Sequence, residues 1–130
     1  DRNRSEVAEG VLALPGDLEP VPRPQPWVAL LPALDPTAMG WAGREFYLGA
    51  HRGALLDTNG NVGPTVCRDG RIVGGWAQRP EGKMVYRLLA DVGAEVTGRV
   101  AAEVARLDAW LGGVRVVPKF RTPLERELAA

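Results

Sequence analysis

The chain has 130 residues, of which 45% are hydrophobic and 25% charged, as is typical of one ordinary globular domain. Its 16 basic residues balance 16 acidic ones, so it lacks the basic excess of a protein that grips nucleic acid tightly by itself. One cysteine and one histidine exclude an internal disulfide and a cysteine-cluster or multi-histidine metal site. No apolar run is long enough to predict a membrane span. We therefore expect a cytoplasmic protein without metal or cofactor.

The first 25 residues are polar and then rich in proline. Residues 10–14 predict a short strand, and the prolines that follow exclude a helix or a central strand. We expect residues 1–25 to be the end of a preceding module and a connector, and residues 26–130 to form the domain. The chain begins with Asp1 instead of methionine, which indicates a piece of a longer polypeptide.

Short elements are predicted next. Residues 27–31 predict a buried strand that ends at Pro32. Asp35 can cap a helix that has proline at its first position and ends at Gly40. Two short helical turns are predicted at 44–48 and 51–57, before an Asn-Gly turn.

Residues 63–93 predict two consecutive hairpins. The first has the two-residue turn Asp69-Gly70, and the second has a three-residue turn over 80–82. These turns give the cross-strand pairs Cys67–Ile72, Trp76–Tyr86 and Gln78–Met84.

Both faces of this predicted meander are partly apolar. One face holds Cys67, Ile72, Gly74, Trp76, Met84, Tyr86 and Leu88, and the other holds Val66, Val73, Gly75, Ala77, Val85, Arg87 and Leu89. Because both faces must be covered, the pattern favours a curled sheet or a barrel over a flat exposed sheet. The Gly74-Gly75 pair predicts the place where the sheet bends.

A long helix follows the meander. Apolar residues at helical spacing predict it over about 94–111; they are Val96, Val100, Val104, Leu107 and Leu111. A closing strand is predicted at 114–118, and a short helix after Thr122 and Pro123. The expected fold is α+β, with a strongly curved, barrel-like antiparallel sheet packed with one long helix and short helical turns.

Basic residues at the hairpin tips are the candidate functional residues. Arg at the tip of a ribbon can enter a DNA groove or hold phosphates. The candidates are Arg68 and Arg71 at one tip, Arg79 and Lys83 at the other, and His51 and Arg52 in the helical turns. No catalytic triad, phosphate loop or paired acid and base can be recognised, so no catalytic residue is assigned.

The strings WVALLPALDPTAMGW (27–41) and YLGAHRGALLDTNGNVGPTVCRDGRIVGGWAQR (47–79) resemble the C-terminal part of the winged-helix DNA-binding domain-containing proteins, which include the AlkZ-type DNA glycosylases. The resemblance runs from residue 27 to the end of the chain. It implies a long parent protein with tandem winged-helix modules, on which a C-terminal barrel-like domain packs. It further implies that relatives cleave the N-glycosidic bond of alkylated or crosslinked bases with a glutamine-containing motif in their N-terminal half. Gln78 lies in the wrong region for that role.

The resemblance also implies that a hairpin of this domain contacts DNA, at one of the two tips. The expected function is that of a non-catalytic, DNA-contacting domain of a DNA-repair glycosylase, with DNA as partner through the full-length protein and no membrane contact. Two alternatives stay open: a structural or protein-interaction module, and a small-molecule barrel with Trp27, Trp76 and Tyr86 around a pocket. Hairpin tips that point apart would favour the protein-interaction module.

Overall fold

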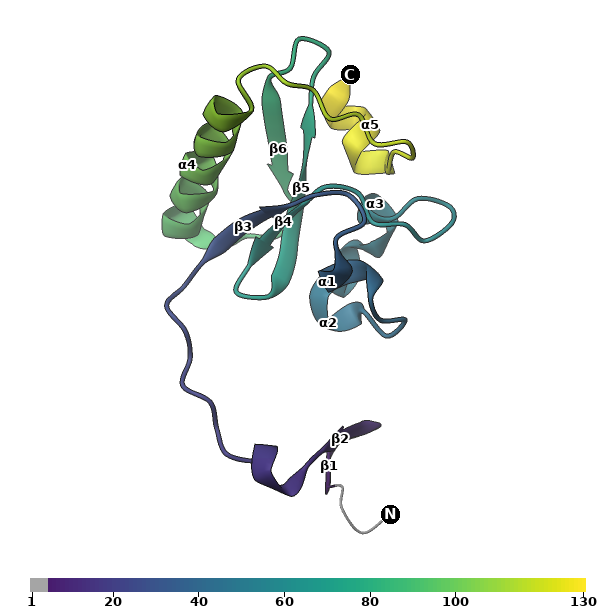
Figure 1. The fold of residues 1–130 in the computed structure, drawn as a ribbon, viewed down its shortest axis with the longest axis vertical. Helices are drawn as coiled ribbons and strands as arrows, with labels where there is room; N and C mark the ends of the chain where they lie inside the picture. Colours follow the sequence, from purple (N-terminus) through teal and green to yellow (C-terminus); the bar gives the residue numbers. More distant parts are fainter. Residues whose placement is uncertain (1–4) are drawn as a thin grey trace.

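The computed structural model describes residues 5–130 (Figure 1), so the first four residues of the predicted N-terminal segment lie outside the described part. The strands β1 (Ser5–Ala8) and β2 (Val11–Ala13) pair as a small antiparallel hairpin of their own. A short 3-10 helix, η1 (Pro15–Asp17), follows, and an extended connector then leads to the main body of the molecule. The strand expected at 10–14 is β2.

One four-stranded antiparallel sheet forms the centre of the molecule. It consists of β3 (Val28–Leu31), β4 (Thr65–Arg68), β5 (Arg71–Gln78) and β6 (Met84–Leu88), in that spatial order. The predicted cross-strand pairs Cys67–Ile72, Trp76–Tyr86 and Gln78–Met84 are all present. Asp69 and Gly70 have φ values of 48° and 81°, which is the left-handed backbone that a two-residue hairpin turn requires.

The prediction of a strongly curved, barrel-like sheet is wrong. The sheet is open, with β3 and β6 as its edges. Helices cover its two apolar faces instead: α4 (Gly93–Leu111) packs on one, and α5 (Pro123–Ala129) packs on the other (Figure 1). An apolar pattern on both faces shows only that both are covered, and layered helices satisfy it as well as closure does.

A β-bulge corrects the predicted faces of β5. Val66 pairs with Gly74 while Cys67 pairs with Ile72, so Val73 is an extra residue without a partner on β4. Ile72 therefore packs in the cluster on the α5 side, and Val73 packs in the cluster on the α4 side. The sequence predicted a bend of the sheet at Gly74-Gly75, whereas the structure has a bulge at Val73, and this bulge exchanges the sides of the two residues before the glycine pair.

The long helix is confirmed with its apolar stripe. All five predicted stripe residues pack against the sheet in one cluster; they are Val96, Val100, Val104, Leu107 and Leu111. The helix ends at Gly112, whose φ of 55° is left-handed. The terminal helix α5 begins as predicted, because the Thr122 hydroxyl accepts a hydrogen bond from the Glu125 amide at 3.4 Å.

The closing strand predicted at 114–118 is wrong. That segment has no regular secondary structure, and the side chains of Val114, Val116 and Val117 are more than half exposed. The buried side chain of Gln78 forms hydrogen bonds with the backbone of this segment instead. Its Nε2 donates to the Val114 carbonyl at 2.9 Å, and its Oε1 accepts from the Val116 amide at 2.8 Å.

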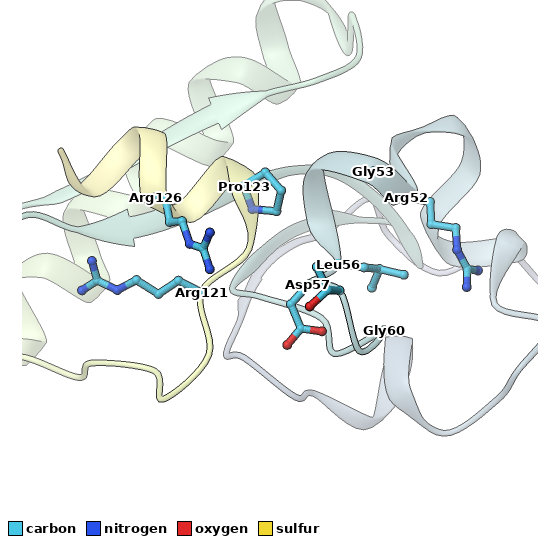
Figure 2. Close-up of a pocket in the computed structure, with 9 residues that line it drawn as sticks. Arg52, Gly53, Leu56, Asp57, Gly60, Arg121, Pro123 and Arg126 are labelled. Carbon is cyan, nitrogen blue, oxygen red and sulfur yellow. The ribbon is translucent and has the colours of Figure 1, made fainter.

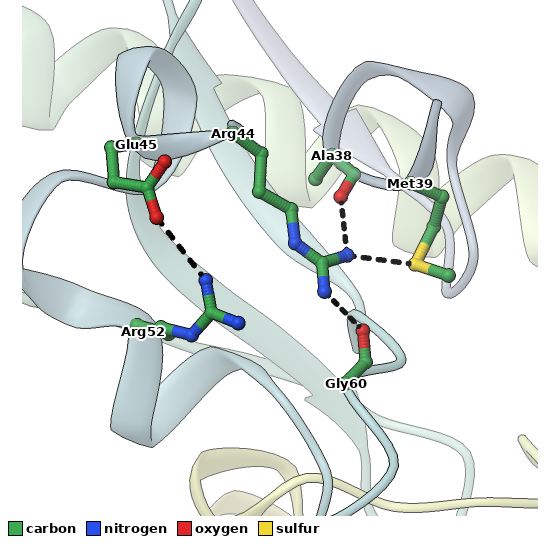
Figure 3. Close-up of polar contacts among 6 residues, drawn as sticks. All are labelled: Ala38, Met39, Arg44, Glu45, Arg52 and Gly60. Atoms are coloured by element: carbon green, nitrogen blue, oxygen red, sulfur yellow. Dashed lines mark hydrogen bonds and ion pairs between the residues drawn. The ribbon is translucent and has the colours of Figure 1, made fainter. Parts of the chain in front are cut away.

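The chain between β3 and β4 forms a small lobe of short helices. They are α1 (Pro36–Met39), α2 (Glu45–Leu48), η2 (Gly49–His51) and α3 (Arg52–Leu55), close to the predicted positions. Arg44 ties this lobe together (Figure 3), because its guanidinium donates to the Ala38 carbonyl at 2.9 Å and to the Gly60 carbonyl at 2.7 Å. A lobe built from four short helices is thereby held in one arrangement beside the sheet.

Candidate nucleic-acid interface

The two hairpin tips lie at opposite ends of the eight-residue strand β5 (Figure 1). At about 3.3 Å per residue, the tips are separated by roughly 20 Å or more. Arg68 and Arg71 flank the first turn as a cross-strand pair. Arg79 and Lys83 flank the second, where the Arg79 amide donates to the Lys83 carbonyl at 2.9 Å. The fold therefore does not bring the four basic residues of the tips to one place.

The first tip forms one wall of a cleft with the connector. Pro24, Pro26 and Trp27 come from the connector, and Asp69 comes from the turn. Three arginines line the same cleft, Arg23, Arg68 and Arg71, and Val73 completes the lining; the volume is about 580 Å³. We call this the tip cleft. Trp27 is 40% exposed, which leaves part of its indole open to solvent.

Backbone hydrogen bonds fix the connector against the tip. The Trp27 amide donates to Asp69 Oδ1 at 2.9 Å, and the Asp69 amide donates to the Trp27 carbonyl at 3.2 Å. On the other side, Arg99 from α4 donates to the Pro26 carbonyl at 3.0 Å and is itself held by Glu95 at 2.9 Å. The two walls of the tip cleft are therefore held in place before any ligand binds.

The tip cleft carries an excess of positive charge. Its one acid, Asp69, is occupied: one carboxylate oxygen takes the Trp27 amide and the other pairs with Arg68 Nε at 3.2 Å. Arg23 and Arg71 are exposed, and neither forms an ion pair with any acidic residue within 5–130. Two guanidinium groups thus have no acidic partner among the described residues and can bind an anion.

A second cleft lies between the helical lobe and α5 (Figure 2). Arg52 lines it on the side opposite Arg121 and Arg126, and its volume is about 510 Å³. Two of its three arginines are ion-paired, because Arg52 pairs with Glu45 at 3.3 Å and Arg121 with Glu125 at 3.6 Å, whereas in the tip cleft only Arg68 is paired. His51 ends η2 beside Arg52, is partly exposed and does not line the cleft.

Asp57 at the edge of this second cleft has a structural role. Its carboxylate accepts the amides of Asn59 and Asn61, both at 2.8 Å, and the Asn61 side-chain amide at 2.9 Å. The side-chain bond from Asn61 is the main cause that holds the pKa of Asp57 below its ordinary value. Asn59 and Asn61 thus stabilise the turn through their hydrogen bonds to Asp57. The negative charge of Asp57 disfavours the binding of an anion in this cleft.

The three aromatic residues expected around one small-molecule pocket do not share one. Trp76 and Tyr86 pack in the core cluster on the α4 side, where Trp76 Nε1 donates to the Leu31 carbonyl at 2.9 Å. Trp27 lies in the tip cleft. Sequence reasoning did not assign Arg23 or Trp27 to a DNA-binding site, because each is unremarkable until the connector folds back on the turn.

The described part of the chain shows neither a metal-binding cluster nor a membrane-spanning helix. No three His, Cys, Asp or Glu residues within 5–130 gather closely enough to hold a metal ion. Over the same residues, no helix combines the length and apolar character that crossing a membrane requires. Cys67 is buried, and burial raises the pKa of its thiol, so it behaves as a small apolar side chain.

Comparison with known proteins agrees with the resemblance. The model of the family described as DNA glycosylase AlkZ-like matches residues 2–110. Among solved structures, the chain is similar to the Streptomyces sahachiroi DNA glycosylase AlkZ, at 29% identity and a TM-score of 0.48 over 63% of this chain and 23% of that chain. The chain thus spans less than a quarter of that protein. No protein of curated function matches. The family match includes the N-terminal hairpin and stops before α5. Because it covers most of the sequence, the chain belongs to the AlkZ-like DNA glycosylase family.

Proposed function

We propose that this chain is a non-catalytic, DNA-contacting part of a DNA-repair glycosylase. In this proposal, residues 1–25 are the end of a preceding winged-helix module and a connector, and residues 26–130 are the C-terminal domain. The observation that carries the proposal is the tip cleft. It gathers three arginines at one end of the sheet in a chain whose net charge is zero.

The chemistry of the tip cleft suits a phosphate backbone. Arginine presents a planar fork of N–H donors that matches phosphate oxygens, and phosphate contacts position a protein on DNA without reading its sequence. Arg23 and Arg71 have no acidic partner among residues 5–130 to compete with a phosphate. The first tip is therefore the better of the two candidate tips. Arg79 and Lys83 remain the weaker candidates because neither of them lines the tip cleft or the second cleft.

A salt titration of DNA binding tests the proposal. The R68A/R71A variant should bind DNA more weakly, and the slope of log K against log salt should fall by about 1, because Arg71 provides one phosphate contact worth roughly 0.9 while Arg68 is paired with Asp69. The R79A/K83A variant removes two exposed charges from the other end of β5 and serves as the matched control. Loss of binding in the control alone would assign the contact to the second tip. Absence of DNA binding by the unmodified chain at low salt would refute the proposal.

A protein-interaction module is the second candidate function. The tips point to opposite ends of the sheet, and apolar side chains are exposed along one stretch of chain: Trp110, Val114, Val116, Val117 and Phe120 are between 52% and 76% exposed. This stretch would pack on winged-helix modules of the same parent protein. Under this candidate, V116D/V117D should destabilise a longer chain that includes those modules and leave the 130-residue chain unchanged.

A further inference from the structure

We propose that the tip cleft binds an unpaired nucleotide, with the base stacked on Trp27 and the phosphate held by Arg23 and Arg71. This inference rests on the proposed DNA contact and narrows it to single-stranded or locally unpaired DNA. The cleft volume of about 580 Å³ lies within the range of pockets that enclose small molecules.

The composition of the cleft is that of a single-strand site. Proteins that hold single strands combine a positively charged groove, which follows the backbone, with aromatic side chains on which bases stack. Trp27 lines the cleft together with Arg23 of the connector and the two arginines of the turn, and Trp27 is 40% exposed. In a duplex the base faces are covered by their neighbours, so a base can reach this indole only when it is unpaired.

The backbone hydrogen bonds of Trp27 explain why its indole can remain partly exposed and stack on a base. Its backbone is bound on both sides to Asp69, at 2.9 Å and 3.2 Å, so its position does not depend on packing of the indole. Trp76 contrasts with it, because Trp76 is half-buried, packs against the core and donates its indole N–H to the Leu31 carbonyl. Trp27 thus has a fixed backbone and lies in a cleft with two guanidinium groups that have no acidic partner within residues 5–130. This arrangement is preorganised for stacking, which lowers the ordering cost of binding.

Two oligonucleotides and three tryptophan variants test the inference. Binding of the 130-residue chain is measured by fluorescence anisotropy with a dT oligomer of about ten nucleotides and with a blunt duplex of the same length. Trp27→Ala should weaken single-strand binding about tenfold and leave duplex binding unchanged, and Trp27→Phe should retain most of the affinity. Trp110→Ala removes an equally large side chain that is 76% exposed elsewhere, so it should change neither affinity.

The outcomes separate this inference from the proposed function. If R68A/R71A weakens DNA binding while Trp27→Ala leaves the single-strand affinity unchanged, the DNA contact stands and the nucleotide site is wrong. Equal losses for both oligonucleotides in Trp27→Ala would also overturn it, because they would indicate a general contact or a folding defect. Thermal unfolding of each variant identifies a folding defect directly. If the unmodified chain binds neither oligonucleotide at low salt, the proposed function itself fails.

Discussion

Gly74, next to the bulge, lies too close to the backbone of β6 for any side chain. A methyl group there would overlap the Arg87 carbonyl oxygen and lie 3.1 Å from Leu88 Cα, and both atoms belong to the backbone of the paired strand. Gly74→Ala should therefore lower the free energy of unfolding by about 1–3 kcal/mol, measured by urea denaturation. Gly98 is the control: it is exposed in α4, and a methyl group there would meet no atom within 4 Å, so Gly98→Ala should stabilise by about 0.5–1 kcal/mol. Equal effects at the two sites would contradict this account.

Glu125 is a buried acid whose Oε2 has no hydrogen-bond partner among the described residues. Burial raises the pKa of its carboxyl, and Arg121 opposes this shift only in part. The unfolded chain therefore loses this proton first, so stability falls as pH rises above the unfolded pKa of about 4.3 and levels off above the folded pKa.

The Glu125→Gln variant has no charge to bury, and a glutamine can still serve in the helix cap. Its melting temperature should match that of the unmodified chain near pH 3, where both side chains are neutral, and exceed it at pH 7. Glu127→Gln, on the exposed side of α5, is the matched control and should show no such gain. A lower melting temperature for Glu125→Gln at pH 7 would show that the ion pair with Arg121 outweighs the cost of burial.

Among the helices and strands, the sequence correctly predicted the features that depend on residues close together in the chain. Both hairpins, the α4 stripe and the Asp35 cap depend on residues close together in the chain, and all of them are present. The bulge at Val73 was missed because one extra residue leaves no mark in an alternating pattern that is apolar on both faces. The strand expected at 114–118 was wrong because the side chain of Gln78 supplies the hydrogen bonds that a neighbouring strand would supply.

Across the molecule, only part of the candidate site could be predicted. The turn chemistry of Asp69-Gly70 placed Arg68 and Arg71 at one tip, and that is local information. Trp27 is hydrogen-bonded to Asp69 of this tip, 42 residues away in the sequence, and no pattern in either segment predicts this contact. The strongly curved, barrel-like sheet was predicted because the sequence shows that both faces of the sheet are apolar but does not show that α4 and α5 cover one face each.

The fold depends on a helix, α5, that lies outside the residues covered by the family match. The match stops at residue 110, yet α5 lies beyond it and fills the face of the sheet opposite α4. Leu124 is 3% exposed, and its Cδ2 would lie 2.7 Å from a methyl group at Gly75, so the helix sits directly on the strand. Leu124→Ala should therefore cost about 2–5 kcal/mol in urea denaturation.

Removal of residues 122–130 should abolish cooperative unfolding altogether, because it exposes the cluster that Leu124, Leu128 and Ala129 cover. The matched control removes residues 1–13 instead, since β1 and β2 pair mainly with each other and lie away from the sheet (Figure 1). That deletion should leave the melting temperature unchanged although it cuts into the family-matched region. If the two deletions had the opposite effects, the stable unit would follow the family match instead of the hydrophobic core.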